Sequence, residues 1–119
     1  MTHIPQDDQQ LNRELAELMG WTNFKEDGNG GMWGTPPDDR WSNSIPDYCN
    51  DPAASLEVQA AAMKGSPLDY LQNLQEVKWG NVKVDIPIHR IIDMMNATPR
   101  ERAMAAWMTL KADTASSSA

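Results

Sequence analysis

Apolar residues recur at helical spacing in several segments of the chain, most clearly near the C-terminus. There, four apolar side chains share one helix face: Ala103, Ala106, Trp107 and Leu110. Thr98 is a favourable helix cap, and Pro99 follows at the first helical position. Glu101 stands three residues after Thr98 and completes a capping box. We therefore expect a C-terminal helix from 99 to about 111.

This helix is expected to pack against a sheet. The alanines at 103, 105 and 106 have high helix propensity and allow a close approach, while Trp107 fills the remaining space. Arg100 and Arg102 point away from the apolar face, so we expect both to be solvated. The chain ends in Ser-Ser-Ser-Ala, and residues 112–119 are expected to form a disordered tail beyond a single domain of residues 1–111.

Two further helices are predicted in the first half of the chain. Leucines at 11, 15 and 18 indicate a helix over about 8–19, ended by Gly20. Asp51 and Pro52 form a second pair of cap and first helical residue, and the helix that they open ends near Gly65.

A β-hairpin is predicted between these two helices, over residues 21–35. Residues 21–26 favour a strand, residues 27–31 form a turn rich in Gly, Asn and Asp, and residues 32–35 return. The next segment, 36–51, reads as a long irregular loop. The fold class is therefore α+β, with helices packed on a small antiparallel sheet in an α/β/α type of sandwich.

The pattern leaves the segment 66–95 ambiguous. Leucines at 68, 71 and 74 favour a helix that a Ser66–Asp69 capping box would open, but 70–79 also fits a strand. Residues 82–86 alternate between apolar and polar side chains and are typical of a strand. Residues 88–95 fit either a short helix or a buried strand.

The net charge of −7 narrows the range of partners. Seventeen acidic and ten basic residues oppose binding to a phosphate backbone or to an anionic membrane surface. The single cysteine, the lack of a signal pattern and the lack of a long apolar run lead us to expect a cytoplasmic protein. Five Trp and eight Met residues are consistent with homo-oligomerisation.

No catalytic or metal-binding set stands out. Loop aspartates at 38, 39, 47 and 51 are typical of caps and turns, and they lack the spacing of a calcium loop. Cys49 with His89 as base matches no known signature. The Gly-rich turn at 28–31 joins two strands and lacks the Lys of a phosphate-binding loop. We expect neither enzymatic activity nor a cofactor.

Binding residues are therefore sought among exposed aromatics. Trp41 lies in the polar loop, which is where binding residues concentrate, so it is the first candidate. Ile45 and Tyr48 share that loop, and Trp33 lies on the returning strand of the hairpin. The tentative interface consists of these four residues, and whether the loop is functional or only structural stays open.

The order of several short motifs resembles a known family. A helix ending in Gly20-Trp21 is followed by the Gly-rich hairpin, by Ile45-Pro46-Asp47-Tyr48, and by an Ala97-Thr98-Pro99 helix start. This order is similar to the phage ABA sandwich domain family, over roughly residues 9–111. The resemblance implies helices on an antiparallel sheet, with strands within 70–79 and 82–93. It implies no activity and no catalytic residues.

The function expected from the sequence is that of a small phage accessory protein that binds a host or phage macromolecule. The partner is expected to be a protein, without direct nucleic-acid or membrane binding. A domain that sequesters a nucleotide-type small molecule is the alternative, and an acidic mimic of DNA is a third reading. The first reading depends on the resemblance and on the aromatic residues of the loop.

Overall fold

The computed structural model describes the backbone of residues 4–28 and 31–117, and the side chains of these residues up to position 114. Within these residues, five helices and three short strands follow one another. They are α1 (Asp8–Leu18), β1 (Thr22–Glu26), β2 (Met32–Thr35), β3 (Asn43–Ser44), α2 (Pro52–Gly65), α3 (Pro67–Trp79), α4 (Ile88–Met95) and α5 (Pro99–Ser117). This confirms the α+β class, the hairpin and the C-terminal helix.

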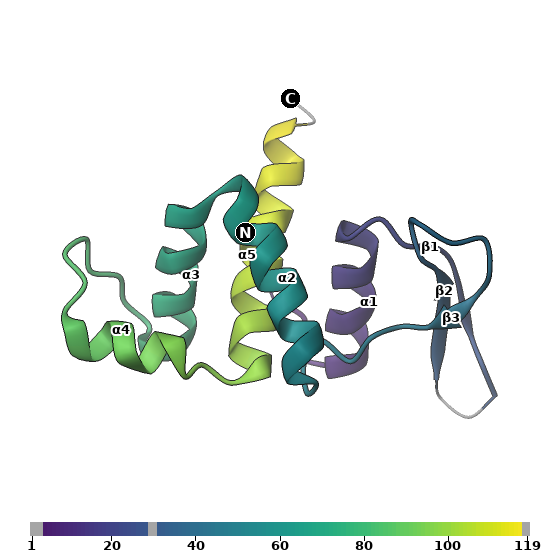
Figure 1. Cartoon of the computed structure of the whole chain (residues 1–119), viewed down its shortest axis with the longest axis horizontal. Coiled ribbons are helices and arrows are strands. Elements are labelled where there is room, and N and C mark those ends of the chain that lie inside the picture. The colour runs from purple at the N-terminus through teal and green to yellow at the C-terminus, as the bar shows by residue number, and fades with distance from the viewer. Residues whose placement is uncertain (1–3, 29–30, 118–119) are drawn as a thin grey trace.

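Helix α5 is the centre of the molecule. It packs against α2, α3 and α1, and Figure 1 shows it between α3 and α1, with α2 crossing it. The sheet lies beyond α1 at one end, and α4 lies at the other end (Figure 1). The main partners of α5 are thus helices, whereas the sequence led us to expect a sheet.

The start of α5 is the capping box that the sequence predicts. The Thr98 hydroxyl accepts a hydrogen bond from the Glu101 backbone N–H at 3.1 Å, and the Glu101 carboxylate accepts one from the Thr98 N–H at 2.9 Å. The Lys78 ammonium of α3 binds the same carboxylate at 3.0 Å. The cap therefore also ties α5 to a neighbouring helix.

Small side chains allow the close helix packing. Ala103, Ala105 and Ala106 are fully buried, and Trp107 is nearly so. These three alanines keep α5 narrow toward more than one neighbouring helix, because residues one to three positions apart point in different directions around a helix. The Trp107 indole N–H donates to Glu14 of α1 at 3.0 Å, which satisfies its polar atom in the core.

Two expectations about α5 were wrong. Arg100 and Arg102 are partly buried and bonded: Arg100 donates to the Asp8 carboxylate at 2.8 Å, and Arg102 donates to the Ser55 hydroxyl at 3.0 Å. The helix also continues to Ser117 through much of the expected tail, because no Gly or Pro interrupts residues 112–117. Positions 118 and 119 lie outside the described residues.

The sheet has the order β1-β2-β3 and is antiparallel throughout. Residues 36–51 were expected to be irregular, but they contribute β3, whose Ser44 pairs with Trp33. Gly34 is buried where an added Cβ would lie 3.2 Å from both the Phe24 and Trp21 rings. Glycine at this position therefore lets β2 lie against the aromatic side chains.

The strands expected after residue 66 are not formed among the described residues. Residues 67–79 form α3 and residues 88–95 form α4, while 82–86 has no regular structure. No strand of the described chain lies beside 82–86, so its backbone cannot join a sheet; instead the Gln75 side chain bonds both backbone groups of Lys83. Ser66 makes no side-chain cap bond, because its hydroxyl donates to Asp113 of α5 at 2.9 Å.

The capping box predicts a defined pH dependence of stability. Burial has the largest single effect on the pKa of the Glu101 carboxylate, and it raises this pKa because it disfavours the charged form. Hydrogen bonds from Thr98 and Lys78 together outweigh burial and hold its pKa below 4.5. A lowered folded-state pKa stabilises the fold above pH 4.5, and this contribution is lost as the pH falls through the folded-state pKa.

Replacing Glu101→Gln should therefore flatten the fall in unfolding free energy below pH 4.5, because the neutral amide does not titrate. Urea unfolding from pH 7 to the acid range measures it. Thr98→Ala is the control that removes the hydroxyl of the helix cap, and it should lower the free energy of unfolding by about 1 kcal/mol. An unchanged acid slope in Glu101→Gln would contradict the assignment.

Candidate functional site

The four residues of the predicted interface do not form one surface. Tyr48 is only 1% exposed and belongs to the core, and Ile45 is half-buried against it. Trp33 is partly exposed, and its indole N–H donates to Asp27 at 3.0 Å. Trp41 is 74% exposed, as a binding residue would need to be. Burial thus removes Tyr48 from any partner contact in the folded state.

The loop that carries Tyr48 is held in place by hydrogen bonds to α1. Asn12 donates to the Asp47 carboxylate at 3.0 Å and accepts from the Cys49 backbone N–H at 3.1 Å. Burial, and then the nearby Asp8 carboxylate, raise the pKa of the Cys49 thiol to about 12. Such a thiol is protonated near neutrality and is a poor nucleophile. His89, its suggested base, lies exposed on α4.

Asp39 and Asp51 of the loop have structural roles. Asp51 caps α2 by accepting from the Ala53 N–H at 3.1 Å, and Asp39 accepts from the backbone N–H groups of Arg40 and Trp41. Among the residues that the structure describes, no group of three or more His, Cys, Asp or Glu side chains could hold a metal ion. No described helix has the length and apolar character needed to cross a membrane.

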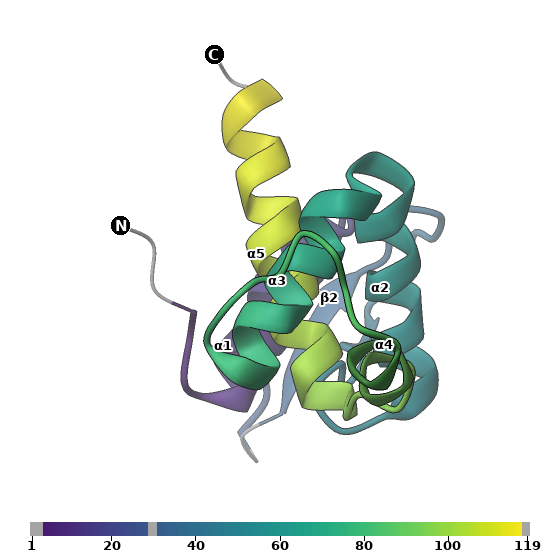
Figure 2. The same cartoon turned by 90° about the vertical axis from the view of Figure 1, so that its left-hand side faces the viewer.

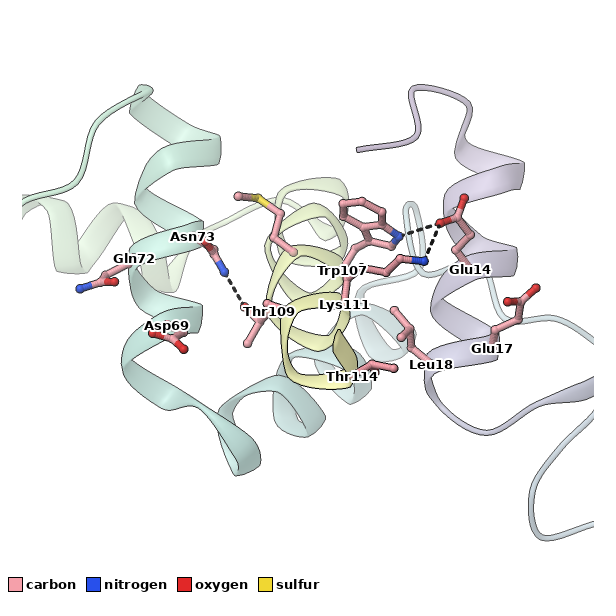
Figure 3. Close-up of a pocket in the computed structure, with 12 residues that line it drawn as sticks. Glu14, Glu17, Leu18, Asp69, Gln72, Asn73, Trp107, Thr109, Lys111 and Thr114 are labelled. Atoms are coloured by element: carbon pink, nitrogen blue, oxygen red, sulfur yellow. Dashed lines mark hydrogen bonds and ion pairs between the residues drawn. The ribbon is translucent and has the colours of Figure 1, made fainter. Parts of the chain in front are cut away.

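A wide groove of about 750 Å³ runs along α5 between α1 and α3 (Figure 3). Its polar side chains bridge the helices. Glu14 of α1 accepts from Trp107 and faces Lys111 at 3.8 Å, and Asn73 of α3 donates to Thr109 at 2.9 Å. Figure 3 shows these bonds crossing from each wall to α5. These groups stabilise helix packing, and their arrangement indicates no particular ligand.

A further surface, the α4 face, differs from the loop around Trp41 and from the groove along α5. We use this name for the four exposed apolar side chains of α4, which are Ile88, Ile91, Ile92 and Met95. Met95 is 76% exposed and Ile92 is 53% exposed. The spacing of these residues, i, i+3, i+4 and i+7, is that of a buried helix face. Here it faces solvent.

The inward side of α4 carries an arginine. Arg90 is only 8% exposed and donates to Gln75 Oε1 at 2.8 Å and to Asn81 Oδ1 at 2.6 Å. Its guanidinium also lies over the Trp79 ring, 4.5 Å from the centroid. Beside it, only Met94 of α4 is buried. The bonds of Arg90 thus fix which side of α4 faces the protein, and the apolar side is left outward.

An apolar groove of about 330 Å³ adjoins the α4 face. Its lining comes from α2, α3, α4 and the segment before α4, and comprises Gln59, Met63, Tyr70, Leu71, Leu74, Ile86, Ile91, Met94 and Met95. No charged side chain lines it. Figure 2 looks from the α4 end of the molecule and shows α4 in front, beside α2. Together, the ridge of α4 and the groove form one apolar surface.

Sequence reasoning described 88–95 as a short helix or a buried strand and did not single out this segment as a site. A signal was present, because Arg90 stands in the same short segment as a helical stripe of Ile and Met, on the side opposite to it. Comparisons of the chain with protein-family models, with curated proteins and with solved structures found no match. The candidate site therefore depends on geometry alone.

Arg90→Ala should lower the free energy of unfolding by about 1.5–3 kcal/mol, because it removes the charged donor from the buried Gln75 oxygen and from the Asn81 oxygen. Arg90→Lys should restore only part of this, since an ammonium cannot reproduce the fork of donors. Denaturant unfolding measures both changes. Arg40→Ala, at an exposed arginine, is the control and should change stability by less than about 0.5 kcal/mol. Equal effects at positions 90 and 40 would contradict the anchoring role.

Proposed function

We propose that this protein acts by binding another protein, and that the α4 face with its groove is the contact surface. The observation that carries the proposal is the orientation of α4, whose charged side chain is buried while its isoleucines face solvent. Leaving such a stripe in water forfeits the free energy that its burial would supply, about 25 cal/mol for each Å². A contiguous exposed apolar patch of this kind is typical of an interaction site.

The chemistry of the surface favours the apolar side of a helix as its occupant. The groove runs beside a helix and has no charged lining, which suits an amphipathic helix laid into it. Its methionines are adaptable side chains that are common at helix-binding surfaces. The proposed partner is therefore a protein that presents an apolar helical stripe.

A membrane is a less favourable occupant. Amphipathic helices that bind lipid carry Lys or Arg beside the apolar stripe. The exposed polar residues of α4 are His89 and Asp93, and its arginine points inward. The net charge of −7 also opposes an anionic surface.

The expectation of a small phage accessory protein is retained as part of this proposal. Its support is the order of motifs in the sequence, and the α4 face adds a place where such a protein would contact its target. The proposal moves the contact surface away from the Trp41 loop, which lies at the sheet end of the molecule (Figure 1).

Met95→Lys should abolish partner binding, while Trp41→Ala should preserve it. The two residues are matched controls because their exposed fractions are nearly equal, 76% and 74%. Lys is a good helix former and suits the C-terminal turn of α4, so the fold should be retained. Partners recovered from the producing cell by wild-type protein would be purified, and their direct binding to the three proteins measured by calorimetry.

Support requires a purified partner that binds wild-type and Trp41→Ala protein but binds Met95→Lys at least about tenfold more weakly. A second copy of the chain counts as a partner in this measurement. Circular dichroism and thermal melting of each variant verify folding. Binding that depends on Trp41 and not on Met95 would overturn the proposal.

A further inference from the structure

The α4 face has the pattern of one half of a two-helix seam. Its residues follow i, i+3, i+4 and i+7, and seen down the helix axis they span an arc of about 100°. Arg90 and Met94 occupy the side of α4 that faces the protein. A second helix lying along this arc would contact all four apolar side chains at once.

The surface is complementary to itself. The ridge of α4 and the apolar groove lie side by side on one face, and Ile91 and Met95 belong to both. A two-fold axis would therefore place the ridge of each copy over the groove of the other. Such an isologous contact needs only one surface patch and closes after two subunits.

The polar residues beside the stripe favour an antiparallel pair. His89 and Asp93 are exposed and lie one turn apart on the same flank of α4. In an antiparallel pair, each His89 would lie beside the partner's Asp93, to which an imidazole N–H can donate. In a parallel pair, these flanks would lie on opposite sides of the seam, so the contact between His89 and Asp93 would be lost, and the helix dipoles would align unfavourably.

The exposed area is enough for a weak dimer. The exposed fractions of the four residues of the α4 face together equal those of about two and a half fully exposed residues. Each side chain has four heavy atoms, and at about 30 Å² for each atom the exposed apolar area is about 300 Å². Apolar atoms make up about 65% of homodimer interfaces, so two copies would bury about 1,000 Å² in total. This is about the lower bound for a specific interface.

We infer that the α4 face binds a second copy of this chain, through antiparallel packing of α4 against the partner's α4. The inference rests on the proposed function and names its partner. The small area makes the association concentration-dependent, with a dissociation constant in the micromolar range or weaker. Each copy would shield the apolar stripe of the other.

Sedimentation equilibrium from about 1 µM to about 500 µM tests the inference on the full chain. The weight-average mass of wild-type and Trp41→Ala protein should rise toward twice 13.3 kDa, while Ile92→Lys and Met95→Lys should each stay near 13.3 kDa. Each Lys reduces the net negative charge of the chain, so a charge effect alone would promote association. Loss of association would therefore report the lost apolar contact.

A wild-type protein that stays monomeric at every concentration would overturn the inference. So would association that both Lys variants retain. The proposed function would survive either result if a different purified protein bound wild-type but not Met95→Lys. It would fail as well only if no protein, the second copy included, showed that dependence.

Cysteine pairs test the orientation. In the antiparallel arrangement, position 88 lies opposite the partner's position 95, and the two copies of position 88 are about 10 Å apart along the helices. An oxidised equal mixture of Ile88→Cys and Met95→Cys proteins should form mixed disulfide dimers several-fold faster than either variant alone. Wild-type protein, whose Cys49 is buried, is the control. Equal or faster linkage within Ile88→Cys alone would overturn the antiparallel arrangement.

Discussion

The close packing of α5 against three other helices is the constraint on which the rest of the structure depends. Three buried alanines, at 103, 105 and 106, allow α1, α2 and α3 to approach the same helix. Larger side chains would push these helices apart and open voids, which protein interiors do not tolerate. Trp107 supplies the volume that the alanines do not. The polar bridges from α5 to Glu14, Ser55, Ser66 and Asn73 are then short enough to form.

The helical centre leaves the two ends of the molecule with different properties. At one end, the sheet is held by Gly34 against aromatic rings and by the loop hydrogen bonds to α1. At the other end, α4 is attached by two inward side chains, of which Arg90 makes the polar bonds. The apolar surface that the protein leaves uncovered is therefore concentrated where packing on α5 stops.

The α4 face also shows why a buried polar group can determine a surface. An arginine bonded to two amide side chains and stacked on Trp79 has a defined orientation. Turning α4 to bury its isoleucines would remove these bonds and the stacking on Trp79, and would leave Gln75 with only its bonds to the Lys83 backbone. The exposed stripe is thus maintained by the partners of Arg90, in the interior of the protein.

Local signals accounted for much of the fold. The Thr98–Glu101 capping box, the Asp51–Pro52 helix start and Gly20 all depend on bonds or backbone angles within a few residues, so they could be identified without the rest of the chain. The candidate site was less accessible. Trp41 is exposed as expected, but Tyr48 is buried in a core whose other members come mostly from helices far away in the sequence.

The sequence by itself determined the α+β class, most helix starts and the hairpin, because caps, turns and periodicity act over short range. Only the tertiary structure decided that 82–86 is not a strand, since a strand needs a neighbour to bond. It alone decided that Arg100 and Arg102 are bonded, and that the stripe of α4 faces outward. Periodicity shows that a helix has an apolar side. Which of its two sides is buried depends on the partners that the rest of the fold offers to the polar side.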